Sequence, residues 1–253
     1  MLAETTRDSI MNFTEVNADP RYQPPRFIDP PPFGYLHLAA AVAPPAGRAP
    51  FPRTTPRKAA LLTELKARTQ QLTGMKAVQR ATVYRAVLLP PPDKRARQAP
   101  RYDVAVLIET TSPGEIEEVQ ATEIYRAMHD SLRQASTDLL VMPAHCIRCV
   151  ADVDKNRQGV FLFNYFDAED KQVALQVWEH VAGWYTAKAG VSNSTLLAPA
   201  GPSDYAFVNH ARWDHSLLRF AIRQFATPSF WTYVRRNLHA YHTRAMPIFY
   251  RRL

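Results

Sequence analysis

Glycine is scarce in this chain, and the motifs that depend on it are absent. Only eight of the 253 residues are glycine, and the sequence contains no G-x-G-x-x-G, G-x-x-x-x-G-K, G-x-S-x-G or H-E-x-x-H pattern. Loops that cradle phosphates need glycine because their backbone must approach the ligand closely. The scarcity argues against a nucleotide cofactor, and the missing motifs give no support to serine-hydrolase or zinc-protease chemistry.

Cysteine is rarer still, with only Cys146 and Cys149. Two cysteines in a chain of this size argue against a disulfide scaffold and fit a reducing cytoplasm. Residues three apart on a strand face opposite sides, so this C-x-x-C is predicted to be neither a zinc knuckle nor a redox-active pair. His239 and His242 are spaced as a metal pair on a helix could be, but no third ligand is apparent, so we expect no metal site.

Long apolar runs are also missing. No stretch approaches the roughly 18 to 20 apolar residues that would span a bilayer. The first residues, MLAETTRDSIMNF, have neither a basic region nor a continuous apolar one and do not resemble a secretory signal. We therefore expect a cytoplasmic protein without a membrane partner.

Lysine is missing where arginine is most abundant. The net charge is +8, and residues 201–253 contain eight arginines, no lysine, and only Asp204 and Asp214 as acids. Arginine without lysine suggests planar, bidentate or stacked contacts with an anionic ligand, although a solvated basic helix face is the alternative. No strand resembles the aromatic RNA-binding pattern K/R-G-F-G-F-V, so we expect no nucleic-acid partner.

Proline, in contrast, is concentrated near the N-terminus. Eleven of the 21 prolines lie in the first 56 residues. Because proline removes backbone donors and fixes φ, residues 1–32 are predicted to form an extended arm and residues 43–56 a long loop. Such an arm packs on its own domain, packs on a partner subunit of a homo-oligomer, or stays disordered. The sequence leaves the three options open.

Hydrophobic periodicity predicts two successive β-α-β-β-α-β units, covering residues 33–152 and 159–253. The expected strands are 33–42, 77–90, 102–110, 138–150, 160–166, 193–200, 205–213 and 246–253. The expected helices are 56–74, 114–132, 168–190, 214–225 and 228–244. Two such units predict an α+β fold made of tandem ferredoxin-like repeats.

The two predicted sheets are expected to pack face to face. Each sheet has one face covered by its helices and one bare face, and joining the bare faces gives a pseudo-dimeric α/β barrel. Corresponding positions align Tyr102 with Tyr205 and His37 with Asn164. The binding site is expected in the space between the sheets.

Two asparagines and a tryptophan share predicted strand faces in the second unit. The period of two places Asn209 and Trp213 on one side of their strand, and Asn164 and Phe166 on one side of theirs. We expect these residues to face the space between the sheets. Buried amides there would cost about 1–3 kcal/mol each unless they are paired with each other, lie at a wet rim, or bind a ligand.

The opposite face of the strand that ends at Trp213 carries His210 and Arg212. In the same scheme these side chains face the covering helices, where His180 also points toward the sheet. A contact between His180 and His210 is then possible, and a buried, hydrogen-bonded histidine is the alternative to a catalytic one. If the facing is reversed, His210 and Arg212 line the cavity instead.

Three short segments of the second unit carry a family resemblance. LFNYF places Asn164 near the end of the first strand, HARWD ends a strand in Trp213 followed by an acid, and TPSFWTYV is a Pro-x-Phe turn into a helix. In this combination the second half resembles the dimeric α/β-barrel superfamily, in particular its antibiotic-biosynthesis-monooxygenase-like members. The first half matches in element order but has Thr110 where the tryptophan would stand.

The resemblance implies a cofactor-independent, monooxygenase-like oxidoreductase, or a related cyclase, acting on a phenolic or enolic aromatic. A deprotonated, electron-rich substrate would itself deliver electrons to dioxygen, while the protein excludes water and orients the ring. His210 would be the base, with Asn164 and Trp213 as the other catalytic residues. The expected substrate-binding residues are Asn209, Phe166, Arg212, Tyr233 and His37.

Two alternatives remain. Heme-degrading relatives carry a ligand histidine just after the Pro-x-Phe turn, where this chain has Tyr233, so a heme protein would use Tyr233, His239 or His180 as its axial ligand. The other alternative is a non-catalytic protein that binds an anionic partner through its basic C-terminal part.

Overall fold

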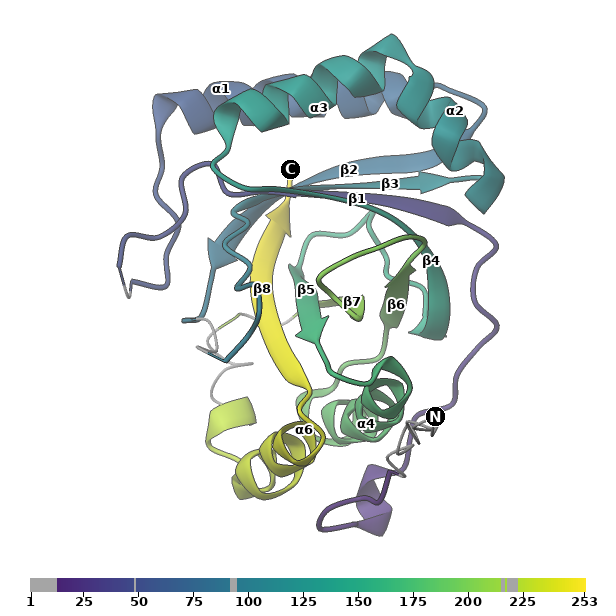
Figure 1. The fold of residues 1–253 in the computed structure, drawn as a ribbon, viewed down its shortest axis with the longest axis vertical. Helices are drawn as coiled ribbons and strands as arrows, with labels where there is room; N and C mark the ends of the chain where they lie inside the picture. The colour runs from purple at the N-terminus through teal and green to yellow at the C-terminus, as the bar shows by residue number, and fades with distance from the viewer. Residues whose placement is uncertain (1–12, 48, 92–94, 215–216, 218–222) are drawn as a thin grey trace, which may run out of the picture.

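The computed structural model describes residues 13–253, except residues 48, 92–94, 215–216 and 218–222 (Figure 1). Its strands are β1 Gly34–Ala40, β2 Val78–Leu88, β3 Val104–Thr110, β4 Leu139–Ala151, β5 Val160–Asp167, β6 Ser194–Pro199, β7 Phe207–Trp213 and β8 Arg244–Arg252. Its α-helices are α1 Pro56–Thr73, α2 Ile116–Ala121, α3 Glu123–Ala135, α4 Lys171–Trp184 and α6 Arg236–Ala240. Short 3₁₀ or π-helical turns are η1 Pro20–Tyr22, η2 Pro113–Glu115, η3 Tyr185–Ala189 and η4 Phe230–Arg235.

The local sequence explains most of the helix ends. Asp170 caps α4 by accepting hydrogen bonds from two backbone N–H groups, and Gly190 ends η3 in the left-handed conformation. The single helix expected over 114–132 is divided, because Thr122 is extended and caps a new helix, α3. Most of the helix expected over 214–225 lies outside the described residues.

All eight strands form one closed antiparallel barrel, in the order β1-β3-β2-β8-β5-β7-β6-β4. Each half contributes a ferredoxin-like sheet, β4-β1-β3-β2 and β8-β5-β7-β6, and the halves join where β2 meets β8 and β4 meets β6. Helices α1 and α3 cover the outside of the first sheet, and α4 and α6 cover the second (Figure 1). The predicted pseudo-dimeric α/β barrel is therefore confirmed.

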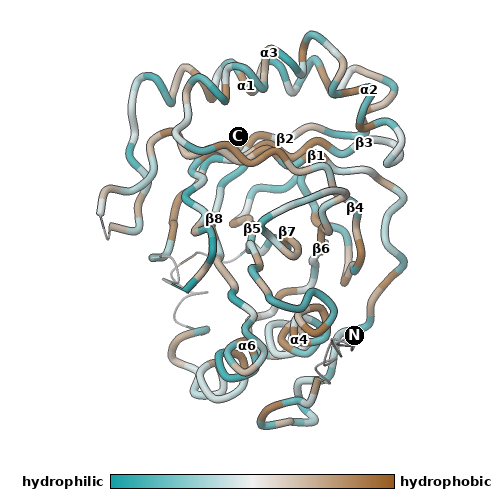
Figure 2. Tube along the Cα trace, in the orientation of Figure 1, coloured by the Kyte–Doolittle hydropathy of each residue, from teal (hydrophilic) through white to brown (hydrophobic). Residues whose placement is uncertain are grey.

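The apolar residues form three layers. Two of them lie between a sheet and its own helices, and the third fills the barrel. In Figure 2 the strands of the first sheet form a brown, apolar band beneath α1 and α3. The barrel interior is mainly aromatic, and its large side chains are Tyr35, Tyr84, Tyr102, Phe161, Phe163, Tyr165, Tyr205 and Tyr250.

Equivalent tyrosines of the two halves meet inside the barrel. The hydroxyl groups of Tyr102 and Tyr205, which the sequence aligns, are 3.2 Å apart. Tyr250 donates a 2.7 Å hydrogen bond to the backbone oxygen of Tyr102. Since a buried phenol needs a polar partner, these bonds allow tyrosine to fill a space that aliphatic residues fill in most cores.

The predicted alignment of His37 with Asn164 is off by one residue. Gly34 pairs with Thr110, and Val160 pairs with Trp213, so the equivalent of His37 is Phe163 and not Asn164. His37 and Phe163 both point into the barrel, where their rings stack with centroids 4.5 Å apart.

The prediction that Cys146 and Cys149 face opposite sides is also wrong. Both side chains are buried in the interior cluster. The register between β4 and β6 shifts between Cys146 and Arg148, so the alternation of faces is interrupted between the two cysteines.

The described part of the N-terminal arm packs on its own chain. Asn237 is fully buried and holds Val16 by two hydrogen bonds, accepting from its N–H at 2.8 Å and donating to its oxygen at 2.9 Å. Farther along, the backbone of Tyr22 and Gln23 lies directly against Gly183 of α4. A partner subunit for the arm stays a prediction.

We predict that Gly183→Ala loosens the arm. A Cβ at this position would lie 2.2 Å from the Gln23 oxygen and 2.4 Å from the Tyr22 oxygen, both backbone atoms, so the arm must shift. We expect a loss of about 1–3 kcal/mol in the free energy of unfolding and faster proteolysis within residues 13–28. Gly114→Ala is the matched control, because its Cβ would make only an ordinary 3.7 Å contact. Equal proteolysis of both variants would contradict the prediction.

Candidate functional site

A cavity of about 700 Å³ lies between the outer face of the second sheet and its helices. The sheet side is formed by β5, β7 and β8, and the helix side by α4, η3, η4 and α6. The sheet contributes Leu162, Asn164, Phe166, Asn209, Ala211, Trp213, Ala245, Pro247 and Phe249. The helical segments contribute Trp178, Val181, Ala182, Tyr185, Phe230, Trp231, Val234, Arg235 and Leu238.

The structure brings Asn164, Asn209, Trp213 and Phe166 together on one face, as the sequence predicts, but that face is not the expected one. These side chains point toward the covering helices, and the expectation that they line the space between the sheets is wrong. The reason is steric. The bulky residues of the other face, such as Phe163 and Tyr165, occupy the barrel interior.

The two amides lie side by side at the bottom of the cavity. Asn164 and Asn209 are directly opposite each other in the pairing of β5 with β7. The Asn209 side-chain oxygen accepts a 2.5 Å hydrogen bond from Ser194 Oγ, whereas Asn164 Oδ1 is buried without a hydrogen-bond partner among the described residues. An unsatisfied buried acceptor costs about 1–3 kcal/mol, which a ligand donor would recover.

Aromatic rings form the walls. Trp213 is 4% exposed and packs edge-to-face on Phe249, with ring centroids 6.0 Å apart. Phe230 lies deeper, whereas Phe225 and Trp231 are 53% and 50% exposed and stand 6.1 Å apart at the rim. Flat apolar walls with few polar groups suit an aromatic ligand.

His210, the predicted base, does not line this cavity. It lies inside the barrel, 1% exposed, stacked on Phe163 with centroids 4.3 Å apart. Its Nδ1 donates to the Leu162 oxygen at 3.0 Å, and its Nε2 accepts from the Tyr84 hydroxyl at 3.4 Å. Burial, helped by the charge of Lys155, holds its pKa well below the usual range. His210 is therefore a neutral, hydrogen-bonded core residue that faces the barrel interior and not the helices.

His37, a predicted substrate-binding residue, is also enclosed in the barrel. Its side chain is fully buried, with Nε2 2.9 Å from the Tyr165 hydroxyl. Burial lowers its pKa to about 3. Arg212 is likewise on the interior side, where it donates to the Gln158 oxygen at 2.6 Å and pairs with Asp214. Neither residue borders the cavity.

The residues proposed as heme ligands face the arm or the surface. The Tyr233 hydroxyl donates a hydrogen bond to Glu15. His180 packs at a tilt against Phe13 of the arm, with ring centroids 4.7 Å apart, so the suggested contact between His180 and His210 is not made. His239 borders a separate pocket.

The donor set of the cavity therefore does not fit the heme alternative as predicted. Among the described residues that line it, none is a histidine or a cysteine, and Tyr185 is the one phenol. Within the same part of the chain, no three His, Cys, Asp or Glu side chains are placed to hold a metal ion. No described helix is long and apolar enough to cross a membrane.

Several lining residues were not predicted. Tyr185, Trp231 and Arg235 come from the π-helical turns η3 and η4, where they follow the lining residues of α4 and precede that of α6 at helical spacing. The one sequence signal that pointed to Arg235 was the presence of arginine without lysine in the last fifth of the chain.

Neither a family model nor a curated protein sequence matches this chain. Solved structures do match. An anthrone oxidase-like protein aligns with a TM-score of 0.61 and 13% identity, covering 87% of this chain and 91% of its own. A protein provisionally described as a monooxygenase from Fusobacterium nucleatum aligns with a TM-score of 0.53 and 7% identity, covering 89% of this chain and 93% of its own. A similarly described protein from Lactobacillus acidophilus aligns with a TM-score of 0.50 and 9% identity, covering 88% of this chain and 94% of its own. The chain has the dimeric α/β-barrel fold of these proteins.

The buried histidines predict a specific loss of stability in acid. The pKa of His37 is about 3 when folded and about 6.5 when unfolded, so between these values only the unfolded chain binds the proton. Stability from this residue is complete above pH 6.5 and falls by about 1.4 kcal/mol per pH unit below it. In denaturant titrations, we expect the wild-type advantage over His37→Gln to shrink by about 2 kcal/mol between pH 7 and pH 5.

Tyr165→Phe is the control, because it removes the hydroxyl partner of His37 but keeps the titrating ring. Its stability should follow pH in parallel with the wild type. Parallel curves for His37→Gln and wild type would contradict the buried, neutral state of His37.

Proposed function

We propose that this chain is a monooxygenase-type oxidoreductase that binds a phenolic or enolic polycyclic aromatic between its second sheet and helices and needs no cofactor. The observation that carries the proposal is the aromatic-walled cavity of about 700 Å³ with two adjacent amides. Cavities of roughly 300–1,000 Å³ with few convergent polar groups typically bind small molecules. The name of the anthrone oxidase-like neighbour supports the same substrate class by analogy of fold.

The two amides have complementary tasks in this proposal. Asn164 Oδ1, which has no partner among the described residues, accepts a hydrogen bond from a substrate hydroxyl. Ser194 Oγ donates a hydrogen bond to the side-chain oxygen of Asn209, so the N–H groups of the Asn209 amide are left to donate to a substrate oxyanion. Such donors stabilise charge strongly in a site that excludes water.

No protein base takes part in this reaction scheme. Among the described lining residues there is no aspartate, glutamate, histidine or lysine. The substrate must therefore be acidic enough to lose its proton to water, and hydrogen bonds to the anion lower its pKa further. This requirement favours phenols and enols conjugated with a carbonyl group over simple arenes.

The overall reaction balances with dioxygen as the only co-substrate. The enolate gives one electron to dioxygen, and the resulting radical pair joins through a new C–O bond to form a peroxide at the ring carbon. Loss of water breaks the O–O bond and leaves a carbonyl group, so that a methylene and O₂ become a ketone and H₂O. Trp213 and Phe166 would hold the ring plane during these steps.

We predict that purified protein without added cofactor oxidises 1,8-dihydroxyanthrone to the anthraquinone faster than buffer does. Asn164→Leu and Asn209→Leu should each lower kcat/KM about 10- to 100-fold, because the first removes the acceptor for a substrate hydroxyl and the second removes the donor to the oxyanion. Oxygen uptake and quinone absorbance measure the rate. Asn156→Leu is the matched control, since Asn156 is exposed and lies outside the cavity lining.

Three outcomes would contradict the proposal. Unchanged rates in both cavity variants would place the reaction elsewhere. Activity that starts only after hemin is added would show that a cofactor is needed. Tight binding of the anthrone without any turnover would make the chain a binding protein.

A further inference from the structure

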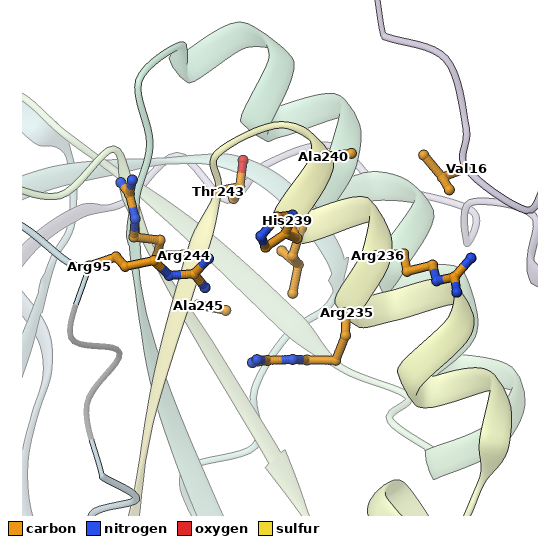
Figure 3. Close-up of a pocket in the computed structure, with 10 residues that line it drawn as sticks. Val16, Arg95, Arg235, Arg236, His239, Ala240, Thr243, Arg244 and Ala245 are labelled. Atoms are coloured by element: carbon orange, nitrogen blue, oxygen red, sulfur yellow. The ribbon is translucent and has the colours of Figure 1, made fainter.

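A second pocket, of about 400 Å³, opens beside the cavity and is rich in arginine (Figure 3). We call it the arginine pocket; its lining residues are Val16, Arg95, Arg235, Arg236, Leu238, His239, Ala240, Thr243, Arg244 and Ala245. Four of these, Arg95, Arg235, Leu238 and Ala245, also line the cavity. The two spaces therefore adjoin, and a single ligand can reach both.

The arginine pocket carries excess positive charge. Of its arginines, Arg244 is engaged by carboxylates, with Asp167 at 3.2 Å and Glu169 at 3.6 Å, and Arg97 also pairs with Asp167 at 2.8 Å. No ion pair between Arg235 or Arg236 and another described residue is present. Even without Arg95, the pocket's Arg235, Arg236 and Arg244, together with the neighbouring Arg97, outnumber the two carboxylates that pair with arginine there in the described part of the chain.

Arg235 is one of the two arginines that line both spaces. Its charge acts on Tyr185 in the cavity, whose pKa burial raises and the Arg235 guanidinium lowers. Figure 3 shows Arg235 and Arg236 leaving the helix in opposite directions, with Arg236 toward the side of Val16. Only Arg235 borders both the aromatic walls and the arginine pocket from η4.

We propose that the arginine pocket binds the carboxylate of an aromatic acid whose rings occupy the adjoining cavity. The inference rests on the proposed function, because it specifies the substrate of the same site. Planar guanidinium groups bind carboxylates through two parallel hydrogen bonds. The apolar cavity holds the rings, and the arginine pocket binds the carboxylate and so fixes the orientation of the rings.

The test compares 9-anthracenecarboxylate with 9-anthracenemethanol, which has the same rings without the charge. Fluorescence titration at low salt should give at least tenfold tighter binding of the carboxylate. Arg235→Gln should remove most of this preference and change the affinity for the alcohol much less, because the alcohol has no charge for Arg235 to pair with. Arg126→Gln is the matched control, because Arg126 is exposed on α3, which covers the other sheet, and it should keep the preference.

Equal affinities for the two probes, or a preference that Arg235→Gln leaves intact, would overturn the carboxylate site but not the cavity. Tighter binding of anthracene-9-phosphonate than of the carboxylate would assign the pocket to a phosphate group and overturn the proposal as stated. Failure of the alcohol and the carboxylate alike to bind would contradict the proposed function and this inference with it.

Discussion

The dense packing of aromatic rings inside the barrel is the constraint on which the candidate site depends. His37, Phe163 and His210 stack on one another, with centroid separations of 4.5 and 4.3 Å, and Tyr84 packs edge-on against Phe163. With these side chains turned inward, the alternating residues of β5 and β7 must turn outward. The helices then cover a face that contains two amides and a tryptophan, and the cavity forms there.

The same packing explains why the histidines are unsuited to catalysis. Moving an imidazole from water into this interior favours its neutral form, and the hydrogen bonds of His210 to Leu162 and Tyr84 occupy both ring nitrogens. A catalytic base needs access to substrate and a pKa near the working pH. Both conditions fail inside the barrel, which is why the proposed site relies on amides and arginines outside it.

The topology could be predicted from the sequence because it depends on the order and period of the elements. Which face of each strand points into the barrel could not be predicted. Both faces of β5 carry large apolar residues, Phe161 and Phe163 on one and Leu162 and Phe166 on the other, so hydrophobic alternation does not distinguish inside from outside. Asn164, Asn209 and Trp213 were correctly placed on one face. Tyr185 and Arg235 were missed because the site was expected between the sheets, so the helix face that covers the second sheet was not searched for lining residues.

We propose that the ligand binds between the second sheet and its helices and not inside the barrel. The most direct test is a crystal structure of the protein with a bromine-labelled anthracene, located by the anomalous signal of bromine. We expect a single strong peak within contact distance of Asn164 and Trp213. A peak among Tyr165, Tyr250 and His37 inside the barrel would contradict it.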